Sequence, residues 1–193
     1  GNTHYAIEDM GIIRCIPGMT IISPSDAGQA LKAFYASWTL NKPVYIRFTG
    51  GLNCPVIYEQ EFNYQIGKGI RLREGNQIQI IATGSMVDRA LKAAKILEEK
   101  GISVDVVDMH TIKPLDTDIL KKDVKLVVSV EEHSIIGGLG SAIAEALSTY
   151  SVHAPLLRLG IGDYFSQVGE YEYLLEQHGL SPEHIANTIE NNL

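Results

Sequence analysis

Short apolar runs alternate with amphipathic segments along most of the 193-residue chain. In the first third this pattern predicts helices at residues 3–15 and 27–40 and strands at residues 19–23 and 43–48. Thr3 and Asp26 are suited to cap the two helices, and Pro24 ends the first strand. The second helix carries one apolar stripe, formed by Ala30, Leu31, Phe34 and Trp38. Strand, helix and strand in succession form the unit that builds a parallel sheet.

Residues 49–69 lack a sustained period and contain several glycines, so they predict a connection between two parts. Beyond it the alternation is more regular. It predicts strands at 78–84, 103–110, 126–132 and 155–161, helices at 86–100, 140–150, 170–178 and 182–191, and a short turn-helix at 116–121. Ser85 and Asp88 suggest a capping box, and Gly101 is placed to end the helix that follows them.

The two parts differ in how complete their pattern is. The later part reads as a whole α/β domain of about 115 residues, with valine-, leucine- and isoleucine-rich strands typical of a sheet covered on both faces. The earlier part has only two clear strands, and a parallel sheet that small cannot cover both of its faces. Since the sequence also begins at Gly1 without an initiator methionine, we expect either a residual tag or a domain whose first strands precede Gly1.

Composition limits the possible functions. The formal net charge of −7 and the absence of a long lysine or arginine cluster argue against a nucleic-acid partner. The apolar stretches are shorter than the roughly 20 residues that a membrane helix needs, and no signal peptide is visible. The only cysteines, Cys15 and Cys54, form no metal-like spacing, so a reducing cytoplasmic setting fits best.

Two residues are candidates for chemistry. His4 lies in a polar turn where a helix is predicted to begin, and the positive end of a helix lowers the proton affinity of a nearby imidazole. It could bind a substrate hydroxyl or transfer a proton, or it could simply pack at the helix start. Arg47 lies at the end of a predicted strand, where parallel sheets bind ligands, and could hold a phosphate or carboxylate. A structural ion pair is the competing interpretation.

The segment "EEHSIIGGLG", residues 131–140, could suggest a metal or phosphate site. Adjacent strand residues point to opposite faces, however, and the glycines do not follow a phosphate-loop spacing. Close packing, including packing across a subunit boundary, explains the glycines better. The other histidines considered are predicted to be ordinary surface or loop residues: His110, His153, His178 and His184. Without a G-x-S-x-G motif, covalent catalysis by a side chain has no support, so an enzyme of this sequence would rely on a cofactor.

Four segments, in order and at sensible spacing, resemble the transketolase family. The opening "GNTHYAIEDMGIIRCIPGMTIISPSD" is similar to that family's histidine motif and the strand after it. The remaining similarity lies in "ATGSMVDRALKAAKILEEKGISVDVVDMHTIKPLD", "VSVEEHSIIGGLGSAIAEAL" and "LGIGDYFSQVG". Asn2 and Tyr5 replace the family's usual proline and glutamine. Both positions lie beside the site, so the resemblance does not fix which sugar is the substrate.

The resemblance implies a three-layer α/β/α architecture with mostly parallel sheets. Residues 1–66 would be the end of a thiamine-diphosphate pyrimidine-binding domain with its connection, and residues 67–193 a complete transketolase C-terminal domain. His4 would be catalytic and Arg47 would bind the substrate phosphate. Thiamine diphosphate and Mg²⁺ are implied as cofactors, with their ligands mostly outside this chain, and no metal ligand is assigned within it.

The implied activity is transfer of a two-carbon ketol unit between sugar phosphates in carbohydrate metabolism and the pentose phosphate pathway. The implied partner is an upstream half or separate subunit, in a homodimer or heterotetramer. Three alternatives stay open. They are a deoxyxylulose phosphate synthase-like enzyme, a 2-oxo-acid dehydrogenase beta subunit and a non-catalytic dimerisation fragment.

Overall fold

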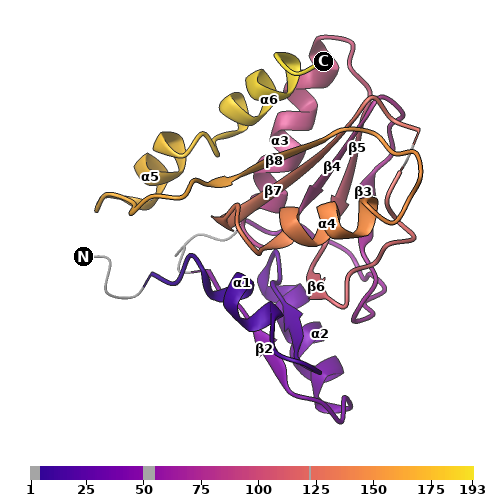
Figure 1. The fold of residues 1–193 in the computed structure, drawn as a ribbon, viewed down its shortest axis with the longest axis vertical. Coiled ribbons are helices and arrows are strands. Elements are labelled where there is room, and N and C mark those ends of the chain that lie inside the picture. Colours follow the sequence, from indigo (N-terminus) through magenta and orange to yellow (C-terminus); the bar gives the residue numbers. More distant parts are fainter. Residues whose placement is uncertain (1–4, 50–54, 122) are drawn as a thin grey trace.

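The computed structural model describes residues 5–49, 55–121 and 123–193, which form two sheets with helices packed on them (Figure 1). The strands are β1 (Thr20–Ile22), β2 (Val44–Ile46), β3 (Ile70–Arg73), β4 (Ile78–Ala82), β5 (Val104–Asp108), β6 (Thr111–Lys113), β7 (Leu126–Ser134) and β8 (Leu156–Ile161). The helices are α1 (Asp9–Arg14), α2 (Ala27–Trp38), α3 (Met86–Glu99), α4 (Leu139–Leu147), α5 (Tyr171–Gln177) and α6 (Pro182–Glu190). This arrangement confirms the predicted α/β fold class.

The larger sheet has five strands in the order β3-β5-β4-β7-β8, and all neighbours except β3 pair in parallel. Every residue of β4 and β5 is buried, as their apolar sequences predict. Alternate side chains point to opposite faces. Ile78 and Ile80 therefore join one core cluster, whereas Ile81 joins the other.

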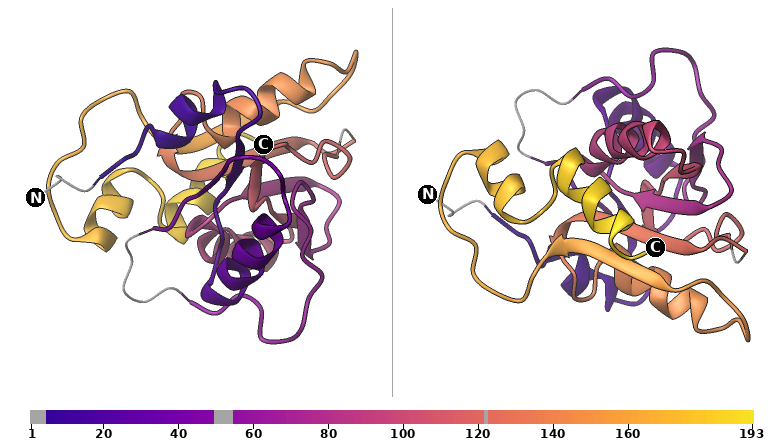
Figure 2. Two further views of the ribbon diagram at one scale, coloured as in Figure 1. Left: turned by 90° about the horizontal axis from the view of Figure 1, so that it is seen from below. Right: turned by 90° about the horizontal axis from the view of Figure 1, so that it is seen from above.

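Helices cover both faces of the larger sheet. α3 and α6 pack together on one face, and Figure 2 shows α4 on the opposite side. Gly101 follows α3 with a φ of 79° and donates its amide to Glu98, so the predicted glycine end of this helix is confirmed. Within the described ranges, no helix combines the length and apolar character needed to cross a bilayer.

The smaller sheet has three strands rather than the two predicted. β1 pairs in parallel with β2 on one side and antiparallel with β6 on the other. β6 follows β5 directly, just past the middle of the sequence, and no local pattern could indicate that it leaves the larger sheet. It joins the later part of the chain to the earlier part.

The first helix is shorter than predicted. α1 begins at Asp9, after an N-cap at Glu8 without a side-chain hydrogen bond, and Thr3 lies outside the described residues. The Ile7 carbonyl accepts the amide of Ser134 at 2.8 Å, and the Gly11 amide donates to His133 at 3.2 Å. If the helix began one turn earlier, the Gly11 amide would donate to the Ile7 carbonyl. Here both groups bond β7 instead, so the helix starts at Asp9.

Two further local predictions are wrong for the same kind of reason. Ser85 has helical dihedral angles and donates its hydroxyl to Glu132, so it forms no capping box. The segment 116–121 is a turn and not a helix, because the Asp116 carboxylate accepts the Gly69 amide at 3.0 Å and the Asp118 amide at 3.2 Å. By contrast, Asp26 caps α2 by accepting the Gln29 amide at 2.7 Å, as predicted.

Candidate functional site

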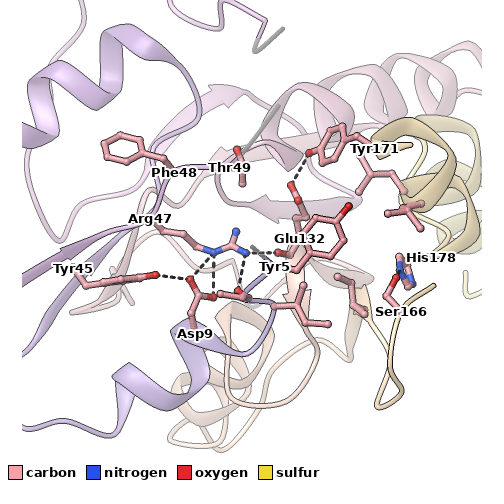
Figure 3. A pocket seen from close by; sticks show the side chains of 15 residues that line it. Tyr5, Asp9, Tyr45, Arg47, Phe48, Thr49, Glu132, Ser166, Tyr171 and His178 are labelled. Atoms are coloured by element: carbon pink, nitrogen blue, oxygen red, sulfur yellow. Dashed lines mark hydrogen bonds and ion pairs between the residues drawn. The ribbon is translucent and has the colours of Figure 1, made fainter. Parts of the chain in front are cut away.

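A cavity of about 540 Å³ lies between the rim of the smaller sheet and the C-terminal part of the chain (Figure 3). Arg47 and Asp9 line it on one side, and Ser166 and His178 line it on the other (Figure 3). Aliphatic lining comes from Ala6, Ile7, Ile161, Leu174 and Leu175. The cavity therefore offers charged, hydroxyl and apolar surfaces to one ligand.

Arg47 directly follows β2, and its backbone amide extends the sheet by donating to Ile22 at 2.8 Å. Its guanidinium forms an ion pair with Asp9 through Nε at 2.9 Å. Nη2 donates to the carbonyl of Glu132 at 3.0 Å and to that of Ala6 at 3.5 Å. The side chain is only 11% exposed, so the guanidinium is held in one orientation at the cavity wall.

Asp9 fixes this orientation from the first turn of α1. Its carboxylate also accepts the Tyr45 hydroxyl at 2.7 Å. Burial, together with the hydrogen bond to Asp9, raises the pKa of Tyr45 to about 12, so this tyrosine stays protonated at neutral pH. The ion pair expected as one interpretation of Arg47 is thus present, and the same guanidinium lines the cavity.

Glu132 lies on β7 and points into the cavity. Its carboxylate accepts the hydroxyl of Tyr171 at 2.6 Å and that of Ser85. Burial is the main cause that raises the pKa of Tyr171, with the Glu132 charge adding to it, so the phenol remains a donor. Two carboxylates, those of Asp9 and Glu132, therefore offset the single positive charge of Arg47 on the described cavity wall.

Glu131 and His133 face the opposite side of β7 from Glu132. The fully buried Glu131 carboxylate accepts the amides of Leu139 at 2.6 Å and Gly140 at 2.8 Å, at the start of α4. Burial raises the pKa of Glu131 to about 7, although these two amides oppose the shift. Because its hydrogen-bond donors are the backbone amides at the start of α4, Glu131 has a structural role in that helix.

The glycines after β7 are required by packing within this chain. A Cβ on Gly138 would lie 2.0 Å from Glu131 Oε2. Gly137 has a φ of 81°, and a Cβ there would lie 2.9 Å from the Cα of Gly11. The predicted close packing is confirmed: Gly138 packs against Glu131 of β7, and Gly137 packs against Gly11 of α1.

His133 is neutral and its tautomer is fixed. The Gly11 amide donates to Nε2 at 3.2 Å, so the hydrogen lies on Nδ1, which donates to the Ser134 carbonyl at 2.6 Å. Burial lowers the pKa of His133. This imidazole therefore joins α1 to β7 and is not available as a general base.

His4 lies outside the described residues, but Tyr5 and Ala6, which follow it, line the cavity beside Arg47. His110, predicted to be a surface or loop residue, lies in the connection between β5 and β6 but not at the surface. It is fully buried, stacks on Tyr64 with ring centroids 4.4 Å apart, and burial lowers its pKa to about 4. Its place right after a fully buried strand was the signal that could have indicated this.

Sequence reasoning missed most of the cavity wall. Asp9, Glu132 and Tyr171 were not selected as site residues, and His178 was predicted to be an ordinary surface or loop residue. Asp9 and Arg47 are 38 positions apart, and only the fold brings them together. The opposite wall had one indication in the sequence. Tyrosine and serine lie within "LGIGDYFSQVG", and a histidine ends the helix that follows it.

The described residues do not offer a site for the diphosphate and Mg²⁺ of a thiamine cofactor. Across residues 5–49, 55–121 and 123–193, no group of three or more histidine, cysteine, aspartate or glutamate side chains could hold a metal ion. Among the described residues that line the cavity, Arg47 is the only lysine or arginine, and it is already paired with a carboxylate.

Comparison with known proteins connects these features to one family. A model of the transketolase C-terminal domain matches residues 67–185, and a model of the transketolase pyrimidine-binding domain matches residues 1–54. The cavity lies between the two matched segments, with Arg47 in one and Glu132 in the other.

Several curated relatives align over almost the whole chain. A putative transketolase C-terminal section of Methanocaldococcus jannaschii is 43% identical, over 98% of this chain and 60% of the relative. The 6-deoxy-6-sulfo-D-fructose transketolase subunit SqwH of a Clostridium species is 42% identical, over 96% and 58%. A 1-deoxy-D-xylulose-5-phosphate synthase of Caldanaerobacter subterraneus is 38% identical, over 98% and 31%. The chain thus spans at most 60% of the length of these three relatives.

Solved structures show the same fold. One, described as a split gene transketolase in an inactive beta4 tetramer, superposes with a TM-score of 0.87 at 37% identity, over 99% of this chain and 62% of that chain. A transketolase from Campylobacter jejuni superposes with a TM-score of 0.74 at 22% identity, over 99% and 29%. The second likeness concerns the fold alone.

Proposed function

The chain belongs to the transketolase family, and on this premise we propose that it is the C-terminal part of a thiamine-diphosphate-dependent transketolase. The complete enzyme would transfer a two-carbon ketol unit between sugar phosphates. When bound, thiamine diphosphate supplies the carbanion chemistry that breaks and forms the carbon–carbon bond. The residues of this chain orient the substrate and exchange its protons.

One observation carries this proposal. Tyr5 and Ala6, in the segment "THYAIED", line the same cavity as Arg47, and the Ala6 carbonyl accepts a hydrogen bond from that guanidinium. The family motif and the arginine thus meet at one wall. We assign Arg47 to the substrate phosphate, which a guanidinium can bind through its remaining donors. We assign His4 to the hydroxyl or carbonyl oxygens near the reacting carbon.

The chain needs a partner for this chemistry. Asp9 and Glu132 offset the charge of Arg47, and the described residues include no metal site. We propose that an upstream half or separate subunit supplies the diphosphate and Mg²⁺ ligands, in a homodimer or heterotetramer. The relative named a C-terminal section and the neighbour described as an inactive beta4 tetramer support this assignment.

Calorimetry with thiamine diphosphate and Mg²⁺ tests the need for a partner. The 193-residue chain alone should give no measurable binding heat. The same chain mixed with a polypeptide that carries the upstream residues should bind the cofactor tightly. Tight binding to the isolated chain would contradict the proposal.

A His4→Ala variant tests the catalytic assignment in the reconstituted enzyme. Turnover should fall by roughly 100-fold or more, the range for loss of a general acid or base, while cofactor affinity changes little. His153→Ala is the control, because His153 is absent from the cavity lining. If turnover of the His4 variant equals that of the wild type, the assignment is wrong.

A deoxyxylulose phosphate synthase is the second candidate, because relatives with that name reach 38% identity over nearly the whole chain. Assays of the reconstituted enzyme with a ketose phosphate donor and with a 2-oxo acid donor separate the two. We expect turnover with the ketose phosphate. Turnover only with the 2-oxo acid would favour the synthase or a dehydrogenase beta subunit, and turnover with neither would favour a non-catalytic dimerisation fragment.

A further inference from the structure

His178, which follows α5, bonds two residues of the loop 162–170 and fixes that loop beside the cavity. Its Nδ1 lies 2.9 Å from the hydroxyl of Tyr164, and its Nε2 lies 2.9 Å from the hydroxyl of Ser166. The Tyr164 and His178 rings also stack, with centroids 5.7 Å apart. Ser166 and His178 line the cavity on the side away from Arg47 (Figure 3).

The hydrogen bond from Ser166 to Gln167 determines which groups donate and which accept in the bonds to His178. The Ser166 hydroxyl donates to the Gln167 carbonyl at 3.2 Å, so its oxygen accepts the hydrogen of His178 Nε2. Nδ1 then carries no hydrogen and accepts from the Tyr164 hydroxyl. In this arrangement the imidazole donates to Ser166 and does not take its proton, so Ser166 is not an activated nucleophile.

Within the part of the chain that the structure describes, this arrangement leaves one lone pair of the Ser166 hydroxyl unused on an uncharged cavity wall. A serine hydroxyl has two lone pairs, and His178 occupies one of those on Ser166. Burial lowers the pKa of His178, which keeps the imidazole uncharged at neutral pH. The wall therefore suits a neutral donor, such as a sugar hydroxyl, better than a second anion.

We propose that Ser166 and His178 form a hydroxyl-binding wall of the substrate cavity, so that the C-terminal domain takes part in recognising the sugar. This inference rests on the proposed function and extends it to residues of the later domain. Ser166 contacts a hydroxyl of the carbon chain between the phosphate and the ketol end, one that ketose phosphates of six and seven carbons carry and five-carbon donors lack. His178 positions Ser166. Arg47 on the opposite side takes the phosphate.

The rest of the cavity fits this orientation. A sugar phosphate carries one anionic end, a chain of hydroxyls and apolar C–H surface. The cavity offers the Arg47 guanidinium, the Ser166 hydroxyl and the side chains of Ile161, Leu174 and Leu175. Inorganic phosphate alone could use only the first of these three.

Kinetics of the reconstituted enzyme test the wall directly. His178→Phe keeps a ring to stack on Tyr164 but removes both nitrogens, and Ser166→Ala removes the acceptor. In both variants KM should rise roughly three- to tenfold for ketose phosphates of six and seven carbons, the effect of losing one neutral hydrogen bond. KM for a five-carbon donor and every kcat should stay within about twofold.

His184→Phe is the matched control. His184 Nδ1 lies 2.8 Å from the Ser181 hydroxyl, in a similar serine–histidine pair that is absent from the cavity lining. Its kinetic constants should equal those of the wild type. If the wild type is active and neither His178→Phe nor Ser166→Ala changes KM for any donor, the inference is wrong while the proposed function stands.

A binding measurement decides the question even if the reconstituted enzyme is inactive. The isolated 193-residue chain is titrated with D-fructose 6-phosphate and, separately, with inorganic phosphate, while side-chain NMR signals of His178 and Arg47 are followed. We expect the sugar phosphate to shift both sets of signals and inorganic phosphate to shift those of Arg47 only. Unchanged His178 signals at tens of millimolar D-fructose 6-phosphate would overturn the inference.

Discussion

The two sheets differ in how much of their surface the chain itself covers. In the larger sheet every residue of β4 and β5 is buried, and α3 alone buries six residues against it. In the smaller sheet all residues of β2 are only half-buried. α2 buries Gln29 and Ala33 but leaves much of its apolar stripe exposed, with Leu31 at 61% and Trp38 at 79%.

The two sheets should therefore contribute differently to folding stability and to substrate binding. Burial of apolar surface is the main source of folding free energy, so the larger sheet should provide most of the stability of the isolated chain. The smaller sheet holds Arg47 at its rim and lies beside the segment that carries the family's histidine motif. Arg47 and the histidine motif, which we propose to bind the substrate, thus belong to the region that this chain leaves partly uncovered, whereas Ser166 and His178 lie in the later part.

The largest expected effect comes from the core of the larger sheet. Ile80→Ala removes a fully buried side chain from β4, next to α3. We expect the free energy of unfolding to fall by about 3–4 kcal/mol, since the change loses apolar burial and leaves a cavity. Urea unfolding followed by circular dichroism measures it. A loss below about 1 kcal/mol would show that the larger sheet is not the stable region.

Asp108 joins the two regions at the end of β5. It is fully buried, and its Oδ2 accepts hydrogen bonds from Ser25 at 2.7 Å, Gln29 at 2.8 Å and Tyr58 at 2.8 Å. Burial raises its pKa from 3.8 to about 6. Because the folded state binds the proton more tightly than the unfolded state, this group favours folding below pH 4 and loses that contribution as the pH rises from about 4 to 6.

An Asp108→Asn variant should therefore lose part of the pH dependence. We expect the drop in unfolding free energy between pH 4 and 6 to shrink by roughly 2–3 kcal/mol relative to the wild type. Urea midpoints measured across this range give the slope, and Asp118→Asn, at an 85% exposed side chain, is the control. Part of the slope should remain, because the raised pKa of Glu131 acts in the same direction. Equal slopes for Asp108→Asn and wild type would refute the assignment.

A smaller effect is expected at the boundary of the cavity. Tyr171→Phe removes the hydroxyl that donates to Glu132 at 2.6 Å, while Ser85 still donates to the same carboxylate. The unfolding free energy should fall by about 1.5–3 kcal/mol, the range for one hydrogen bond to a charged group. Thermal unfolding is a sufficient measurement, with Tyr173→Phe on the exposed side of α5 as the control. Matching losses in the two variants would argue against the contact with Glu132.

The smallest effect is expected on α2. Trp38 is 79% exposed, so Trp38→Ser should change the unfolding free energy of the isolated chain by no more than about 0.5 kcal/mol. Comparison with Ile80→Ala under identical urea conditions sharpens the contrast between the sheets. A loss of several kcal/mol at Trp38 would mean that the chain covers this face itself in solution.

Much of the fold could be predicted because its signals are local. Near-continuous apolar runs identified β4, β5, β7 and β8, and Asp26 and Gly101 marked the ends of two helices correctly. The site was predicted only in part. Arg47 was selected from its place after a strand, but its partner Asp9 and the opposite wall at His178 come from distant segments.

The sequence by itself determined the fold class and the order of most elements, because these depend on side-chain periodicity and residue spacing within short windows. Its motifs also carried the resemblance to the family. Only the tertiary structure decided where α1 begins, that Ser85 bonds Glu132 and that β6 completes the smaller sheet. It also decided which residues share the cavity. The physical reason is common to these cases: each depends on a hydrogen bond or contact between groups far apart in the chain, and such a contact outweighs a local preference worth about 1 kcal/mol or less.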